Sequence, residues 1–298
     1  MRLTDYRNMD ADQLAELLFI AEDRLELACV QEMARREEML PILSQVVTTK
    51  HNWLSELPAW WAVVHSTYIL GMRGGEEAVM PLLAALRWSD AFDCDWVTEV
   101  LPAIFGRLGP AAIPGLTAVI RDPSAGWAVR DVAMKGLAAM SLSWPESTEH
   151  VFRLIGERFM DEGEEPSVRH LAGHILLDFR RADYRLALVK YAKDQALVSE
   201  FDYWYNPGLN SDEVEWAFRG GEPELWHYTD DWMRFYEPAE IQRRQKRWMR
   251  ERLGAGRLPR DRQQPGGGGR VLPLWDRNPD QGTAEPPAKP EPDNPGSK

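Results

Sequence analysis

The sequence has little cysteine, no long uncharged stretch and no recognisable export signal. Its two cysteines, Cys29 and Cys94, have no second cysteine or histidine at the spacing of a metal site. We therefore expect two reduced, packed thiols, as in a cytoplasmic protein, and no disulfide. The longest stretch without a full charge, 57–72, is too short to span a bilayer, and no apolar run follows the basic residue at the N-terminus. These absences predict a soluble chain with neither a membrane span nor a membrane partner.

Basic residues are also scarce relative to acidic ones. The chain has 35 lysines and arginines against 47 aspartates and glutamates, a net charge of −12. Proteins that bind nucleic acid neutralise phosphates with clustered basic side chains, so we expect no nucleic-acid partner. A basic protein partner fits this charge, although an acidic surface can also serve only solubility.

Motifs for chemistry are absent as well. The sequence contains no glycine-rich phosphate loop, no Ser-His-Asp order and no nucleophile elbow, so we predict no catalytic residue and no cofactor. One pair needs comment: His170 and His174 are four residues apart and share a helix stripe, which Asp178 extends by another turn. Two ligands at this spacing can share a metal, but a solvated or hydrogen-bonded histidine pair is the commoner arrangement.

What the sequence does contain is a helix-turn-helix unit over 109–140, in a chain that is 44% apolar. Apolar residues recur at helical spacing on both sides of the tetrapeptide 121–124. Pro123 should end the first helix near Arg121, and Ser124 can cap the second. Because such a pair cannot bury its apolar faces alone, it needs stacked copies. The first-helix copies are Leu40-Pro41-Ile42-Leu43, Met80-Pro81-Leu82-Leu83, Ile113-Pro114-Gly115-Leu116 and a copy without proline from Val151.

The second helices of these copies are predicted over 59–72, 95–108, 127–140 and 168–179. Their spacing of about 33 to 40 residues is typical of paired-helix solenoids. Before them, Asp10 and Gln13 form a capping box that should begin an N-terminal capping helix. A further helix is expected over 184–195. The predicted fold is all-α, an α-solenoid of antiparallel helix pairs.

These residues resemble HEAT repeats, particularly the lyase-type HEAT-like subclass. The resemblance rests on the Asp122-Pro123 turn, on the aliphatic-proline first helices, and on the Val129-Arg130 and Val168-Arg169 pairs that open second helices. It covers about 37–179. Over a similar span, the motifs Tyr68-Ile69-Leu70-Gly71, Met80-Pro81-Leu82-Leu83 and Thr98-Glu99-Val100-Leu101 also resemble bacterial HEAT-like proteins of unassigned function. The resemblance implies a fold rather than an activity, because this scaffold serves both binding and catalysis.

Three activities within that resemblance can be weighed against the residues. Deoxyhypusine hydroxylases use His-Glu pairs as iron ligands, and this chain has no His-Glu pair. DNA glycosylases with HEAT-like folds need a basic groove, which the net charge opposes. Lyases that load bilin onto antenna proteins share the repeat type, but the resemblance supplies no catalytic residue for them.

After the predicted solenoid domain, 1–198, the composition changes twice. Segment 199–253 is rich in aromatic and acidic residues, Trp204 and Trp232 among them, and ends in a basic helix over 241–253. The rings either cover the last repeat as a cap or form an aromatic partner site, and we expect the basic helix to contact the acidic segment. Segment 254–298 is rich in proline and glycine and is expected to be a disordered tail. Its apolar cluster 271–275 is either a docking motif or a chance cluster.

Aligning the second helices on Phe105, Leu137 and Leu176 predicts a polar row. Equivalent positions in stacked repeats lie close together. One such position holds Glu99, Asp131 and His170, and the next turn holds Tyr68, Lys135 and His174. We expect this row to line the concave face, where it either holds a cation or a basic side chain or is only a solvated polar ladder. The predicted function is a protein-protein interaction scaffold. The alternative is a HEAT-like enzyme or metal-binding protein that uses the same row.

Overall fold

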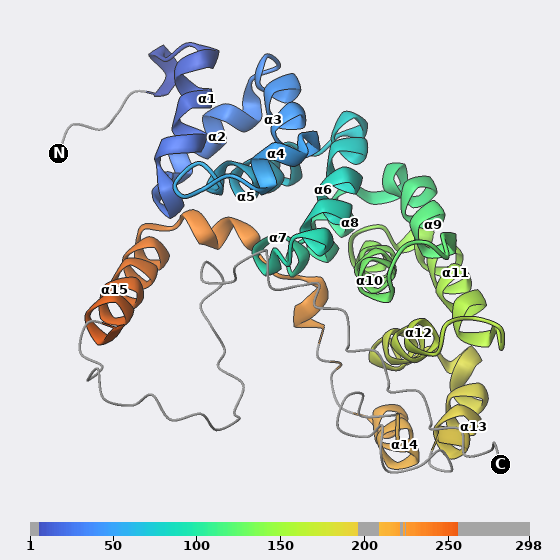
Figure 1. Cartoon of the computed structure of the whole chain (residues 1–298). Coiled ribbons are helices and arrows are strands. Elements are labelled where there is room, and N and C mark those ends of the chain that lie inside the picture. The colour runs from blue at the N-terminus through green and yellow to red at the C-terminus, as the bar shows by residue number, and fades with distance from the viewer. Residues whose placement is uncertain (1–5, 196–208, 221–222, 224, 256–298) are drawn as a thin grey trace, which may run out of the picture. The chain divides into compact units, whose positions relative to one another are not determined.

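The described part of the chain is helical. The computed structural model describes residues 6–195, 209–220, 223 and 225–255, in which there are α-helices and short 3-10 helices but no strand (Figure 1). It divides into two units, Met1–Trp248 and Met249–Lys298. This confirms the all-α prediction for the described residues. The α-helices are α1 Ala11–Ile20, α2 Leu27–Arg35, α3 Met39–Thr48, α4 Lys50–Trp53, α5 Trp61–Arg73, α6 Val79–Ala91, α7 Asp95–Thr98, α8 Leu101–Leu108, α9 Ile113–Arg121, α10 Trp127–Ser143, α11 Thr148–Met160, α12 Pro166–Asp178, α13 Arg185–Gln195, α14 Ser211–Arg219 and α15 Pro238–Ala255.

Local signals place several helix ends correctly and one cap incorrectly. The Asp10 side chain accepts a hydrogen bond from the Gln13 amide at 2.8 Å, and the Gln13 side chain accepts from the Asp10 amide at 3.0 Å, which confirms the capping box. Helix α9 ends at Arg121, as Pro123 predicts. Ser124 does not cap α10, because its hydroxyl and amide both donate to Asp122 Oδ1. The turn uses Ser124 internally, and Gly126 takes the N-cap position.

The single helix predicted over 95–108 is two helices. Helix α7 ends at Thr98 and α8 begins at Leu101. Pro102 explains the break, since proline has no amide hydrogen to donate to the carbonyl four residues earlier and its ring clashes with that carbonyl. At the second position of α8 the missing donor costs little.

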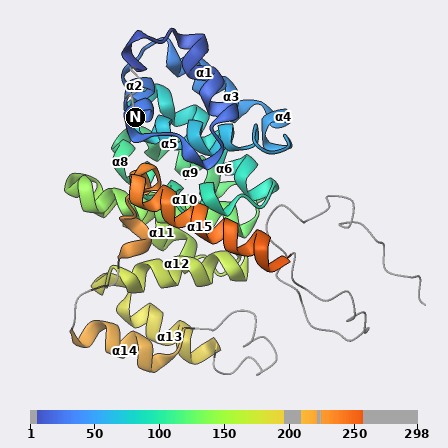
Figure 2. The same cartoon turned by 90° about the vertical axis from the view of Figure 1, so that its left-hand side faces the viewer.

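Successive second helices approach closely through glycine. A Cβ atom at Gly71 of α5 would lie 2.8 Å from the Ile104 side chain of α8, and one at Gly106 of α8 would lie 2.7 Å from Ala139 Cβ of α10. Figure 2 shows the helices in order from α1 at the top to α13 and α14 at the bottom. Any residue other than glycine at Gly71 or Gly106 would force α5, α8 and α10 apart.

Two arginines join the helices within a pair in the same way. Arg130 near the start of α10 donates through Nε to the Ile120 carbonyl at 3.0 Å, and Arg169 of α12 donates to the Phe159 carbonyl at 3.2 Å. Each acceptor lies ten residues before its arginine, at the end of the preceding helix. These bonds satisfy carbonyls that the end of a helix leaves unpaired. The Val-Arg pairs noted in the sequence therefore have a common structural role.

One stretch of the described chain, Asp95–Arg121, is long and apolar enough to cross a membrane by length and composition. It is divided into α7, α8, the 3-10 helix Gly109–Ala112 and α9, and 56% of its most apolar window is buried inside the protein. A buried core segment of a soluble protein has these properties. Cys29 and Cys94 are free and buried, as expected, and burial raises the pKa of each thiol to about 12.

After α13 the described chain resumes at residue 209. Helix α14 packs against α12 and α13. Residues 225–248, here called the return segment, contact α12, then α8 and α10, and finally α5 and the N-terminal residues, so that they run back along the second helices. Trp204, the tail 256–298 and its cluster 271–275 lie outside the described residues, and the predicted domain boundaries at 198 and 253 remain predictions.

Candidate interaction site on the second helices

The return segment is held to α5 by a buried histidine. His65 Nε2 lies 2.6 Å from the Glu22 carbonyl, which can only accept, so Nε2 carries the proton. His65 Nδ1 then accepts from the Tyr236 hydroxyl at 3.0 Å. Both side chains are completely buried, and burial lowers the pKa of His65 to about 4. The imidazole is therefore neutral at pH 7 with both nitrogens hydrogen-bonded.

A buried ion pair closes the same end of the segment. Arg244 of α15 donates through Nε to Asp23 Oδ2 at 3.2 Å and through Nη2 to the Asp23 and Phe235 carbonyls at 3.0 and 2.7 Å. Gln245 donates to the other carboxylate oxygen of Asp23 at 2.6 Å. Arg244 and Asp23 are 7% and 2% exposed. The basic helix therefore makes an intramolecular contact, as expected, but its acidic partner comes from the N-terminal part of the chain. We call this region, with His65 and Tyr236, the aromatic junction.

Two predicted binding residues lie inside this junction. The Tyr68 hydroxyl donates to the Trp96 carbonyl at 2.7 Å, and the Trp232 indole donates to the Tyr68 carbonyl at 3.2 Å. Tyr68 is 2% exposed and Trp232 is 7% exposed. Phe235 packs against both Tyr68 and Trp61, with its ring centre 5.4 Å from that of Tyr68 and 5.9 Å from that of Trp61. Tyr68 and Trp232 therefore contact the chain itself and present no open surface to a partner.

A second region of the return segment borders a group of carboxylates on α10 and α12. Lys135 donates to Asp131 Oδ2 at 2.7 Å. The other oxygen, Oδ1, is buried and has no hydrogen-bond partner among the described residues. Burial raises the pKa of Asp131, and the lysine only partly opposes that effect. Asp131 is thus a buried carboxylate that its own surroundings satisfy incompletely.

Asp178, at the end of α12, belongs to the same group. The Tyr228 hydroxyl donates to Asp178 Oδ2 at 2.7 Å, and the Tyr228 ring lies against Phe179 with the centres 4.8 Å apart. Burial raises the pKa of Asp178 despite this bond, and the negative charge of Asp131 adds to the shift. His227 is close enough for both carboxylates to raise its pKa, but burial and the positive charge of Lys135 outweigh them and lower it.

Glu99 lies in a second acidic group, between α7 and α8. Its side chain is exposed, yet burial still raises its pKa, and the charges of Asp95 and Asp230 add to that effect. Asp230 belongs to the return segment. We refer to Glu99, Asp131, Lys135, Asp178 and His227 together as the carboxylate face.

The two histidines of the predicted row contact each other. His170 Nε2 and His174 Nε2 are 2.9 Å apart, and His170 is 3% exposed. Within the described residues, no three histidine, cysteine or acidic groups come together in a way that could hold a metal ion. In this structure the two side chains contact each other along one stripe of α12.

The residues of the predicted row therefore form separate pairs and groups rather than one connected row. The structure pairs Asp131 with Lys135 and His170 with His174, while the acidic neighbours of Glu99 are Asp95 and Asp230. Sequence reasoning missed Tyr228 and His227, which join the site from the return segment. The sequence shows that both residues lie in a stretch rich in aromatic and acidic residues. No local pattern, however, pairs that stretch with α10 and α12. Trp204 lies outside the described residues.

In comparisons with known proteins, no family model, no curated protein and no solved structure matches this chain.

Proposed function

We propose that this chain is a cytoplasmic protein-protein interaction scaffold, and that its helix pairs α3/α5, α6/α8, α9/α10 and α11/α12 are HEAT-like repeats of an α-solenoid. Three features support the repeat interpretation. Arg130 and Arg169 bond the end of the preceding helix from equivalent positions. Gly71 and Gly106, which also correspond in the alignment of second helices, allow neighbouring second helices to approach. First helices also pack on one another, α3 with α6 and α6 with α9.

The partner in this proposal presents a basic segment to the carboxylate face. The observation that carries it is Asp131, whose Oδ1 is buried and unpaired within the described chain. The pKa values of Asp131, Asp178 and Glu99 are all raised by burial, so each carboxylate gains from an added positive charge. Lys135 is the cation bonded to this group. A lysine or arginine from a partner would bond the exposed Glu99 carboxylate directly and add positive charge beside the buried Asp131 and the half-buried Asp178.

The test uses a fluorescently labelled lysine-rich peptide and the same peptide with glutamine at each lysine. Fluorescence anisotropy measures binding to the full chain and to a Glu99→Gln, Asp131→Asn double variant. We expect the wild type to bind the lysine-rich peptide. The double variant should bind it at least about tenfold more weakly, which corresponds to a loss of about 1.4 kcal/mol in binding free energy. Both substitutions remove charge with little change of shape.

The matched control is Glu149→Gln with Glu157→Gln, which removes the same charge from α11. Glu149 and Glu157 form exposed ion pairs with Arg181 and Arg121, away from the second helices. This control should bind the peptide within about twofold of the wild type, since exposed pairs contribute little. Equal weakening by both double variants would show that net charge, rather than the carboxylate face, attracts the peptide, and would refute the proposed site.

A metal-binding protein is the second candidate, favoured by the His170–His174 contact at 2.9 Å. Two imidazoles on adjacent turns can chelate one transition-metal ion. Elemental analysis of the purified full chain tests this, with His174→Asn as the matched variant. A metal present in stoichiometric amount in the wild type and lost in the variant would favour this candidate over the scaffold.

A further inference from the structure

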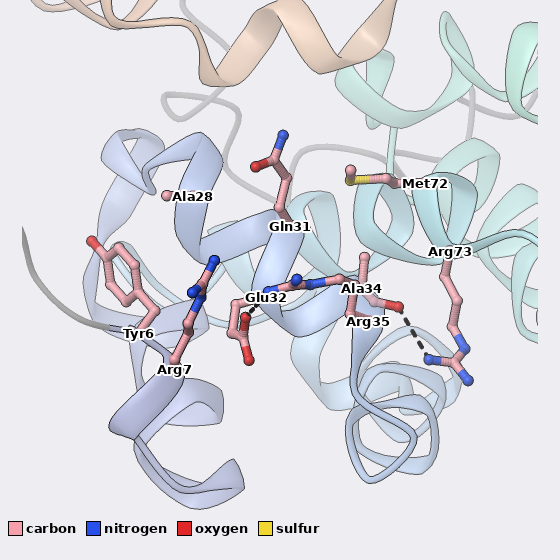
Figure 3. Close-up of a pocket in the computed structure, with 9 residues that line it drawn as sticks. All are labelled: Tyr6, Arg7, Ala28, Gln31, Glu32, Ala34, Arg35, Met72 and Arg73. Atoms are coloured by element: carbon pink, nitrogen blue, oxygen red, sulfur yellow. Dashed lines mark hydrogen bonds and ion pairs between the residues drawn. The ribbon is translucent and has the colours of Figure 1, made fainter.

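The N-terminal part of the first unit contains a pocket of about 520 Å³ that the proposed function does not use. It lies between the 3-10 helix Tyr6–Asn8, α2 and the end of α5 (Figure 3). Three of its lining residues are arginines, Arg7, Arg35 and Arg73, and its one lining carboxylate is Glu32. The lining therefore carries an excess of positive charge, in a chain whose net charge is −12.

The wall of the pocket is fixed by an arginine behind it. Arg36 donates to the carbonyls of Tyr6, Arg7 and Met9 at 3.2, 2.9 and 2.7 Å, which fastens the first described residues to α2. It also bonds Glu32 at 2.8 Å. These bonds hold the backbone that carries Arg7 without using the side chain of Arg35. The pocket is thus a built feature of α2 and its surroundings.

Glu32 cannot neutralise the guanidinium groups around it. Its carboxylate bonds both Arg35 and Arg36, and the hydrogen bond from Arg36 is the main reason that its pKa is lowered. Figure 3 shows Arg7 and Arg35 extending toward the space on either side of Glu32. Arg73 has a carboxylate of its own, because its Nη2 atom bonds Glu37 at 2.8 Å. Glu32 is shared between Arg35 and Arg36, so an anion entering the pocket would add a second negative charge beside Arg35.

Arg35 is the residue best placed to bind such an anion. Within the described part of the chain, its Nη2 atom bonds Glu32, and its side chain is 64% exposed. The other guanidinium N–H groups are arranged as a fork that matches two oxygens of a phosphate or carboxylate. Arg73 has a different role, because it donates to the Ala34 and Arg36 carbonyls at 3.1 and 3.0 Å and fixes α5 to the end of α2.

The remaining lining residues are suited to a ligand that has an apolar organic part. The apolar part of the lining consists of the Met72 thioether, the Tyr6 ring and small alanine side chains, and the exposed Gln31 amide also lines the pocket. A volume of about 520 Å³ is within the usual range for small-molecule sites. The geometry points to a binding site for a small organic anion, a compound that carries a phosphate or carboxylate on an apolar body.

The test uses isothermal titration calorimetry on the full chain with phenyl phosphate, benzoate, inorganic phosphate and benzylamine. We expect phenyl phosphate or benzoate to bind at least about fivefold more tightly than inorganic phosphate, since only the organic anions contact Met72 and Tyr6. Benzylamine, with the opposite charge, should not bind. Preference for phenyl phosphate over benzoate would identify the phosphate as the recognised group, and the reverse would identify the carboxylate. Failure of both organic anions to bind at millimolar concentration would overturn the inference.

Two variants locate the binding. Arg35→Gln should bind the preferred anion at least about tenfold more weakly, because it removes the forked guanidinium group. The matched control is Arg121→Gln, whose side chain is 52% exposed, is paired with Glu157 and lies outside the pocket. Arg121→Gln should bind as the wild type does. Equal weakening by both variants would show unspecific charge attraction and overturn the inference. Thermal melting checks folding, and Arg7→Gln, on a different element of the pocket, should also weaken binding if Arg35→Gln unfolds.

Discussion

The aromatic junction and the carboxylate face lie along the same return segment but differ in how their buried polar groups are satisfied. At the junction, both His65 nitrogens are bonded, and Asp23 accepts from Arg244 and Gln245. On the carboxylate face, Asp131 Oδ1 is buried without a partner in the described chain. A buried polar group that is fully paired stabilises one fold, whereas one left unpaired raises the free energy of the fold. The first is a structural contact, and the second is the place that we propose for a partner.

The two regions should also respond to pH with opposite signs. Burial lowers the pKa of His65, a base, and raises the pKa values of Asp131 and Asp178, which are acids. In each case the neutral form is favoured in the fold. Acidification should therefore lower the contribution of the junction to the stability of the fold and raise that of the carboxylate face. The predictions that follow separate the two.

Removing the junction's arginine should have the largest effect. Arg244→Met leaves the carboxylate of Asp23, which is 2% exposed, without its ionic partner. We expect the free energy of unfolding to fall by about 3 to 5 kcal/mol, the usual cost of breaking a buried ion pair from one side. Urea denaturation measures it. Arg243→Met is the control, since that side chain is 72% exposed and its pair with Glu240 should contribute less than about 1 kcal/mol. Similar losses in the two variants would contradict a structural role for the junction.

His65 should make the junction sensitive to acid. Its pKa is about 4 in the fold and about 6.5 when unfolded, so between these values the unfolded chain binds more protons. The stability that neutral His65 contributes is complete above pH 6.5 and is lost as the pH falls to 4, by about 3 kcal/mol. Denaturation curves at several pH values should show this loss.

The control for this acid effect is His65→Asn, which cannot titrate. It should be less stable than the wild type at pH 7, because it loses hydrogen bonds, but its stability should change less between pH 6.5 and 4. An equally steep loss in the variant would assign the acid sensitivity to other groups.

Removing one hydroxyl from the junction should have a smaller effect. Tyr236→Phe keeps the ring and leaves His65 Nδ1 buried without a donor. We expect a loss of about 1 to 3 kcal/mol in the free energy of unfolding, the cost of an unsatisfied buried group. Tyr184→Phe is the matched control, because the Tyr184 hydroxyl makes a 3.4 Å bond at a partly exposed position and its removal should cost within about 0.5 kcal/mol. If Tyr236→Phe costs no more than Tyr184→Phe, the His65 bond contributes nothing to the junction.

Local chemistry made much of the helical framework predictable. The Asp10 capping box and the end of α9 at Arg121 depend on residues within a few positions of one another. The break between α7 and α8 also has a local cause, Pro102, but the apolar periodicity that continues across it predicted a single helix. Ser124 was assigned to the wrong element because it can bond either the helix start or Asp122, and only the fold chooses between them.

The path of the return segment could not be predicted in the same way. Tyr236 is 171 residues from His65, and Arg244 is 221 residues from Asp23. No periodicity or cap specifies a pairing over such distances. Alignment of the second helices placed Asp131 and Lys135 on one face, because those positions repeat along the chain. It could not supply Tyr228 or His227, which reach the face from outside the repeats.

The smallest expected effect on stability distinguishes the carboxylate face most sharply from the junction. Burial raises the pKa of Asp131 even though Lys135 bonds it, so the charged form is unfavourable in the fold. A carboxyl group with a raised pKa destabilises the fold progressively as the pH rises from its unfolded pKa through its folded pKa. Asp131→Asn removes this charge, and we expect the free energy of unfolding at pH 7 to be unchanged or higher by about 1 kcal/mol.

Urea denaturation at pH 4 and pH 7 tests this for Asp131. The gain from Asp131→Asn should be larger at pH 7 than at pH 4, because a raised pKa means that the wild-type carboxyl takes up its proton in the fold more readily as the pH falls, which is the reverse of the pH dependence that His65 gives the junction. The same variant should weaken the lysine-rich peptide, so that binding falls while stability is kept or increased, as is common where a site is strained for function. A loss of more than about 1 kcal/mol at pH 7 would instead make the Asp131–Lys135 pair a structural contact of the same kind as Asp23 and Arg244.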